Sequence, residues 1–135
     1  MQNIKVTVKI KLSALWITIM FFYSYADILG FYKPGNIAEL ISGEIAGIQI
    51  TPTLLFGMAV LMVIPSLMIF LSLILKAKIN RWTNIILGVT YASVAFMTLF
   101  TTGNWTYYLV FGIGEIIIAI LIIFHSWKWP KQEAF

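Results

Sequence analysis

The chain has 135 residues, of which 61% are hydrophobic and 10% are charged, and it carries a formal net charge of +4. Soluble domains are about half apolar and about a quarter charged, so this composition excludes a water-soluble globular protein as well as a disordered chain. There is no cysteine, which excludes disulfide bonds and thiolate-bound metals. A helix that spans a bilayer needs about 20 apolar residues, so the chain has room for about four such helices in one domain.

The predicted fold is an all-α transmembrane four-helix bundle, because the apolar stretches are continuous rather than alternating as in a membrane barrel. The first helix is predicted at about residues 12–31. Fifteen uncharged residues separate Lys11 from Asp27, and the chain stays apolar for the next four. This segment is too long for the apolar core of a secretory signal, and no small-residue cleavage site follows it, so we expect it to be retained.

The second helix is predicted at about residues 52–75. It lies in a run of 31 uncharged residues, and Thr51 and Pro52 supply an N-cap and the favoured proline at the first helical position. Pro65, in the middle of this helix, removes one backbone hydrogen bond and frees the carbonyl group of Leu61. We expect a kink there, with packing as the favoured explanation and a role in a binding site as the alternative.

The third and fourth helices share an uncharged run of 33 residues, 82–114, which is too long for one span. Turn residues cluster at 101–104, a loop signal that divides the run into helices predicted at about 84–102 and 105–127. Small residues mark the expected sites of close helix packing: Gly88, Ala92, Gly112, Gly114 and Ala119. Aromatic residues typical of a membrane interface begin the fourth helix: Trp105, Tyr107 and Tyr108.

The positive charges are distributed unevenly between the two sides of the predicted bundle. One side has a single basic residue, Lys33, and the other has eight: Lys5, Lys9, Lys11, Lys76, Lys78, Arg81, Lys128 and Lys131. Cytoplasmic loops carry the excess of lysine and arginine, so we expect both termini in the cytoplasm and a location in the plasma membrane, the inner membrane of a bacterium. Three separated basic clusters do not form the contiguous face that a nucleic-acid partner needs, so the expected partner is the lipid bilayer.

The predicted outward connection, residues 32–51, is too apolar for a free loop. A turn at residues 34–36 lets Asn36 cap a short helix that Gly43 ends. Three apolar residues have helical spacing and are expected in the membrane interface, with Glu39 towards water: Ile37, Leu40 and Ile41. We interpret the segment as a cap over the mouth of the bundle, and a lid that gates a ligand is the alternative.

Glu115 is the most informative polar residue, because its expected position is near the bilayer midplane. It follows the start of the fourth helix by about ten residues, or about 15 Å along the helix axis. A charged carboxylate at that depth costs at least ~2.5 kcal/mol, so it must face the bundle interior and be paired, hydrated or protonated. A ligand site and a hydrogen bond between helices are both compatible with this position.

Asp27 is expected about 6 Å from the outer end of the first helix, with Tyr23 four residues earlier on the same face. If Asp27 and Glu115 both face the interior, their depths differ by about 9 Å, so they do not form a direct acid pair. They would instead line one polar cavity that opens outward. The other candidate hydrogen-bonding residues of its walls are Tyr23, Gln49, Tyr91 and Thr98. The alternative for Asp27 is an ordinary interfacial carboxylate.

The sequence contains no motif for phosphate binding, dinucleotide binding, zinc binding or nucleophilic catalysis. No catalytic residue and no metal site is therefore predicted, no cofactor is identified, and an enzyme is the less favoured class. His125 is the single histidine, and its place beside tryptophans near the end of the fourth helix is typical of a membrane interface.

Four strings of the sequence carry a resemblance to a known family: residues 25–29 (YADIL), 43–52 (GEIAGIQITP), 80–85 (NRWTNI) and 127–130 (WKWP). Over nearly the whole chain they resemble a family of small uncharacterised bacterial four-helix integral membrane proteins. In general build the chain is also similar to the wider DoxX-like group, some of whose members are associated with quinone-linked oxidation. The resemblance implies a four-helix topology and assigns no activity.

Three hypotheses follow for the function. The first is a non-enzymatic membrane protein that binds or transports a small amphipathic or cationic molecule in an outward-facing polar pocket, with Glu115 at its base and Asp27 near its mouth. Four helices are few for a carrier, so this hypothesis includes a homodimer. The second is a membrane redox subunit that binds a quinone or another lipid and needs a partner or a bound cofactor for electrons. The third is a structural or assembly subunit in which both carboxyl groups only hold helices together.

Overall fold

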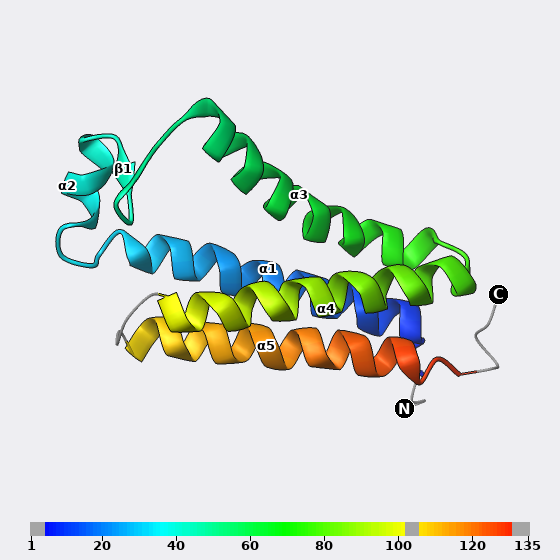
Figure 1. Cartoon of the computed structure of the whole chain (residues 1–135). Helices are drawn as coiled ribbons and strands as arrows, with labels where there is room; N and C mark the ends of the chain where they lie inside the picture. The colour runs from blue at the N-terminus through cyan, green and yellow to red at the C-terminus, as the bar shows by residue number, and fades with distance from the viewer. Residues whose placement is uncertain (1–4, 102–105, 131–135) are drawn as a thin grey trace.

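The computed structural model describes residues 5–101 and 106–130, and this part of the chain is almost entirely helical (Figure 1). In chain order the elements are α1 (Val8–Gly30), α2 (Asn36–Ile41), β1 (Glu44–Ile45), β2 (Ile48–Gln49), α3 (Pro52–Ile74), α4 (Ala77–Thr101) and α5 (Thr106–Trp127). The helices α1, α3, α4 and α5 are each long and apolar enough to cross a membrane. The predicted all-α class and its four apolar helices are therefore confirmed.

Two of the long helices begin earlier than predicted. α1 begins at Val8 rather than at residue 12, and α4 begins at Ala77 rather than at residue 84, so that only residues 75–76 connect it to α3. Lysine and arginine are good helix formers whose charged heads extend to water along an apolar stem. A charged residue therefore marks the edge of the apolar layer and not the end of the helix.

The second and fourth predicted helices correspond to α3 and α5. Each differs from the predicted range, 52–75 or 105–127, by a single residue at one end. α4 ends at Thr101. The rest of the predicted turn, residues 102–104, lies outside the described residues.

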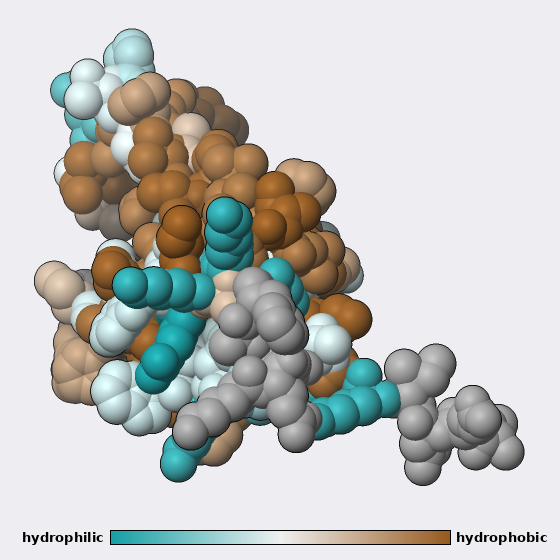
Figure 2. Space-filling model, turned by 90° about the vertical axis from the view of Figure 1, so that its right-hand side faces the viewer, coloured by the Kyte–Doolittle hydropathy of each residue, from teal (hydrophilic) through white to brown (hydrophobic). Residues whose placement is uncertain are grey.

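The helices α1, α4 and α5 lie side by side, and α3 crosses the bundle obliquely (Figure 1). α3 packs chiefly on α1, approaches α4 near the α3–α4 connection, and diverges from the other helices towards Pro52. The start of α1, the end of α5 and the α3–α4 connection lie at one end of the bundle. This basic end carries Lys9, Lys11, Lys76, Lys78, Arg81 and Lys128. Figure 2 looks onto it, and hydrophilic side chains gather there in front of the apolar helices.

The tightly packed core lies in the half of the bundle nearer the basic end. Its buried residues come from all four long helices and include Leu12, Trp16, Ile19, Met68, Tyr91, Ile118, Ala119 and Ile122. A Cβ atom added at Gly88 would lie 2.8 Å from the Ile123 side chain, so α4 and α5 approach closely there. This contact is the kind expected where small residues mark helix packing in membranes.

A buried polar cluster joins α1, α3 and α4 near the basic end. Trp16 Nε1 donates to Asn84 Oδ1 at 2.7 Å, and Asn84 Nδ2 donates to Asn80 Oδ1 at 2.6 Å. Asn80 Nδ2 donates to the backbone carbonyls of Ser72 at 2.7 Å and Leu75 at 3.3 Å, at the last turn of α3. Because buried polar groups are costly unless they are hydrogen-bonded, this cluster fixes the end of α3 against α1 and α4.

The connection between α1 and α3, residues 32–51, contains a hairpin as well as the predicted short helix. Gly35 has a left-handed backbone conformation (φ +88°) and is the N-cap of α2, whereas Asn36 is its first helical residue and not the cap. The Asn36 side chain instead donates to the Gly30 carbonyl at 2.7 Å. β1 and β2 pair antiparallel across a two-residue turn, 46–47, in which both residues have positive φ. The sequence lacks the Asn-Gly or Asp-Gly signal of such turns, which explains why no hairpin was predicted.

Candidate functional site

A cavity of about 140 Å³ lies between α1, α3, α4 and α5, in the half of the bundle remote from the basic end. This inner cavity is lined by Tyr23, Ala26, Asp27, Leu61, Met62, Tyr91, Val94, Ala95, Thr98, Tyr108 and Glu115. None of these lining residues is a lysine, arginine or histidine. The cavity lies in the half of the bundle where α3 diverges from α4 (Figure 1). In the other half the helices are closer, and core side chains fill the space between them.

Glu115 lies on the face of α5 that packs into the bundle. The buried residues of this face recur at helical spacing: Gly112, Glu115, Ile118, Ala119, Ile122 and Ser126. The Glu115 side chain is 8% exposed and lines the inner cavity. Within residues 5–101 and 106–130, no group forms a hydrogen bond or an ion pair with its carboxyl group. The cavity therefore contains a buried acidic group that has no partner among the described residues.

Two glycines of α5 allow α1 and α4 to approach its backbone closely beside Glu115. A Cβ atom added at Gly112 would overlap the Leu99 side chain of α4, and one added at Gly114 would overlap the Phe22 ring of α1. Both helices can therefore press against the α5 backbone on either side of Glu115. Close packing thus directs the carboxyl group between α1 and α4.

A second cavity of about 580 Å³, the outer cavity, adjoins the inner one. Three residues line both cavities: Ala26, Asp27 and Tyr108. The remaining walls come from the end of α1, the α1–α3 connection and the beginnings of α3 and α5: Gly30, Phe31, Lys33, Asn36, Glu39, Leu40, Glu44, Ile45, Ala46, Met58 and Tyr107. Asp27, which is exposed, thus lies where the two cavities meet. The α1–α3 connection forms a wall of the outer cavity.

Tyr91 connects the inner cavity to the backbone of α3. Its hydroxyl donates to the Leu61 carbonyl at 2.7 Å. This is the carbonyl that Pro65 deprives of its backbone donor, and α3 continues as a helix through the proline. The Tyr91 ring lies edge-on to the ring of Trp16, and its centroid is 6.3 Å from that of Tyr23. Pro65 therefore contributes to the packing of α3 on α4, which is the favoured sequence-based explanation.

Five of the six residues predicted to line one cavity do line the inner cavity: Tyr23, Asp27, Tyr91, Thr98 and Glu115. Gln49 is the exception. It is an exposed residue of β2 whose pairing partner is Glu44, and it lines neither cavity. The unpredicted hairpin explains the difference, because strand pairing sets which residues of the segment face the bundle. The ligand-binding role of the other five residues stays a prediction.

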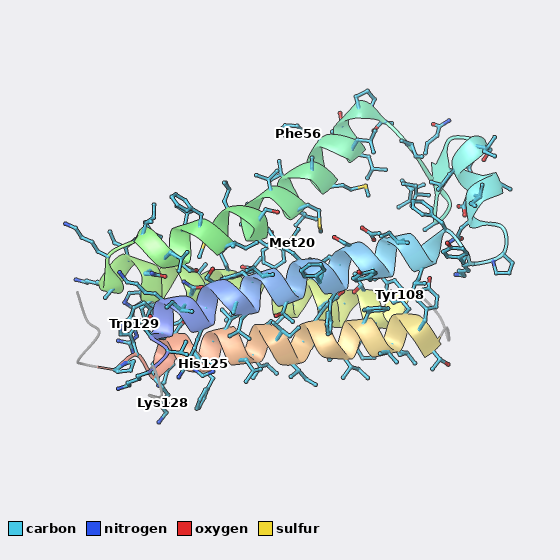
Figure 3. The ribbon with its side chains drawn as sticks, turned by 180° about the vertical axis from the view of Figure 1, so that it is seen from behind. Met20, Phe56, Tyr108, His125, Lys128 and Trp129 are labelled. Carbon is cyan, nitrogen blue, oxygen red and sulfur yellow. The ribbon has the colours of Figure 1, made fainter. Side chains whose placement is uncertain are left out.

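Tyr108 is the cavity residue that sequence reasoning missed, because it was assigned to the aromatic belt of the membrane interface. It precedes Glu115 by seven residues, or two helical turns, which places both on one face of α5. That spacing is the signal that would have found it. Figure 3 shows Tyr108 in the half of the bundle opposite to three labelled residues of the basic end: His125, Lys128 and Trp129.

The part of the chain that the structure describes contains no group of side chains suited to bind a metal ion. There, no three His, Cys, Asp or Glu residues are grouped so that they hold a metal ion. His125 lies far from the acidic residues of the inner cavity, at the other end of the bundle (Figure 3).

Four long apolar helices around an acidic cavity are the features of a multi-pass membrane protein. The chain belongs to the Family of unknown function (DUF6326), whose model matches residues 3–135. No curated protein and no solved structure matches the chain. All residues of both cavities lie within the matched range.

Proposed function

We propose that the protein is an integral protein of the plasma membrane that binds a small cationic or amphipathic molecule in its inner cavity and carries it across the bilayer. The observation that supports this function is the state of Glu115, which is buried, lines a cavity and has no partner among the described residues. A charged group at such a depth costs free energy that water, a proton or a ligand must offset. A cation offsets it well, because opposite charges attract strongly where the dielectric constant is low.

In the proposed orientation both termini lie in the cytoplasm and the outer cavity opens to the outside. The distribution of charge supports this orientation, because lysines and arginines gather at the basic end. At the opposite end, Lys33 is the one basic residue among those that line the cavities.

Infrared difference spectroscopy of the full chain in lipid vesicles tests the proposed function. Comparison with the Glu115→Gln variant identifies the carboxyl band of Glu115. We expect at least one of three small amphipathic or cationic molecules to change this band: choline, benzylammonium or hexanol. His125→Gln, at the basic end, is the control and should preserve the response. A Glu115 band that none of the three changes would reject the pocket and favour a structural subunit in which the carboxyl group only joins helices.

A second candidate function is supported by the aromatic lining of the inner cavity. Tyr23, Tyr91 and Tyr108 line it, and aromatic residues suit the head group of a quinone. A coloured preparation, or a quinone extracted from the purified protein, would favour the redox subunit over the carrier.

We also propose that the carrier acts as a homodimer, because four helices are few for a transport path. α3 has a broad exposed apolar face, which includes Leu55, Phe56, Val63, Leu67 and Phe70. Phe56 lies on α3 near its outward end (Figure 3). Cross-linking in native membranes should yield a species of twice the mass. Recovery of the monomer alone would reject the dimer and leave the pocket proposal unchanged.

A further inference from the structure

The acidic residues of the chain are concentrated around the two cavities. Of the five acidic residues in the sequence, four line them: Asp27, Glu39, Glu44 and Glu115. The fifth, Glu133, lies outside the described residues. Lys33 is the single basic residue that lines the outer cavity, and no basic residue lines the inner one. Charges of one sign in a cleft with low-dielectric walls raise the local concentration of the opposite ion, so both cavities attract cations.

The Glu115 carboxyl group also requires hydrogen-bond donors. A carboxylate accepts several hydrogen bonds, and a buried polar group left without them costs free energy. No residue in the described ranges donates to Glu115. Tyr91 has a hydroxyl in the same cavity, but it donates to the Leu61 carbonyl. The other hydroxyl residues of this cavity, Tyr23, Thr98 and Tyr108, do not donate to Glu115 either, so a molecule that supplies its own donors fits the site.

The other walls of the inner cavity fit a short apolar or aromatic body. They include Leu61, Met62, Val94 and Ala95, together with the rings of Tyr23 and Tyr91. An apolar cavity of about 150 Å³ in another protein holds one benzene molecule. The inner cavity, at about 140 Å³, therefore has room for about one ring, and the outer cavity that adjoins it provides space for the rest of a slightly larger molecule.

We propose that the inner cavity binds a primary ammonium ion with an apolar body of about one ring, the ammonium group at Glu115 and the body beside Tyr23 and Tyr91. An ammonium group supplies both the positive charge and three N–H donors, and hydrogen bonds between charged groups are about twice as strong as neutral ones. A quaternary ammonium ion lacks the donors, and an alcohol lacks the charge. This inference rests on the proposed function and names the class of its ligand.

Calorimetric titration of the full chain in lipid nanodiscs tests the ligand class with three probes that share one ring: benzylammonium, benzyltrimethylammonium and benzyl alcohol. We expect benzylammonium to bind about tenfold or more tightly than either of the others. Glu115→Gln keeps the shape of the side chain and removes its charge. This variant should weaken benzylammonium binding by about tenfold or more and change benzyl alcohol binding little. His125→Gln, at the basic end, is the matched control and should keep the native affinity.

A second variant and a second measurement keep the test decisive if the Glu115→Gln chain does not fold. Circular dichroism and the unfolding temperature report the folded state of each variant. Glu115→Asp retains a carboxyl group on a shorter stem, so it should bind benzylammonium with intermediate affinity. In the native chain, benzylammonium should shift the infrared band of Glu115 more than benzyltrimethylammonium does.

Several outcomes would overturn the inference. Equal or tighter binding of benzyltrimethylammonium or benzyl alcohol would reject the ammonium ligand and leave the proposed pocket in place. Unchanged benzylammonium affinity in a folded Glu115→Gln chain would reject the placement of the ammonium group. If sodium chloride alone changes the Glu115 band as benzylammonium does, a metal ion is enough to occupy the site, and the ammonium ligand is rejected. If none of the ring probes binds, the inference fails, and choline and hexanol then decide the proposed function separately.

Discussion

At the scale of single residues, packing rather than a polar contact orients Glu115. Gly112 and Gly114 allow α4 and α1 to reach the α5 backbone on either side of it. The carboxyl group is therefore held in the wall of the inner cavity although no described residue bonds to it. The two glycines belong to the site as much as the acid does, because a larger residue at either position would separate the helices that form the wall.

Gly114→Ala should destabilise the fold, because the added Cβ atom would overlap the Phe22 ring in a close-packed interface. Overpacking of this kind costs about 1–3 kcal/mol. Gly57→Ala on α3 is the matched control, since nothing lies within 4 Å of the added atom. It should be neutral or stabilise the helix by about 0.5–1 kcal/mol. Reversible unfolding in detergent measures both changes, and equal effects would contradict the contact between α5 and α1 at this glycine.

At the scale of elements, α3 is fixed at one end and joined to the cavity near its middle. The Asn80 and Asn84 side chains hold its last turn, and the Ser13 hydroxyl of α1 donates to the Ile69 carbonyl at 2.7 Å. On the cavity side of Pro65, Tyr91 donates to the Leu61 carbonyl. The proline therefore leaves the Leu61 carbonyl of α3 free to accept a hydrogen bond from Tyr91 of α4. This hydrogen bond couples the position of α3 to the wall of the inner cavity.

Tyr91→Phe should lower the free energy of unfolding by about 0.5–1.5 kcal/mol, because the Leu61 carbonyl loses its donor. In a Pro65→Ala background the amide of residue 65 donates to this carbonyl in the usual helical pattern, so the same Tyr91→Phe change should cost less. The four unfolding free energies of this double-mutant cycle give the coupling. The same cost in both backgrounds would show that the hydroxyl does not act through Leu61.

At the scale of the whole molecule, the charges are separated between the two ends of the bundle. Lysines and arginines gather at the basic end, and four of the five acidic residues surround the cavities in the other half. Positively charged loops stay in the cytoplasm, so this charge pattern supports the proposed orientation, in which the acidic cavities would open to the outside.

Single-cysteine labelling tests this orientation directly, because the chain has no cysteine of its own. Gln49→Cys, on the exposed strand β2, should react with a membrane-impermeant maleimide in intact cells. Lys128→Cys, at the basic end, should react only after the cells are lysed. The reverse pattern would place the termini outside and the cavities towards the cytoplasm.

The sequence by itself determined the four apolar helices and the inward position of Glu115. Hydropathy and turn residues act within one segment, so the number of spans follows from the chain alone. The cost of a charge in lipid likewise requires Glu115 to face the bundle, whichever helices surround it. The same local reasoning found the acceptor that Pro65 leaves at Leu61, because a proline always removes its own backbone donor.

Only the tertiary structure decided which side chains share the cavity. The rotation of the helices makes Tyr91 the donor to the Leu61 carbonyl and places Tyr108 in the cavity wall. The pairing of the hairpin leaves Gln49 outside both cavities. Those rotations are set by contacts between segments distant in the chain, such as Phe22 against Gly114. Residue spacing gives the face of one helix but not the face of its neighbour, and a cavity is formed by both.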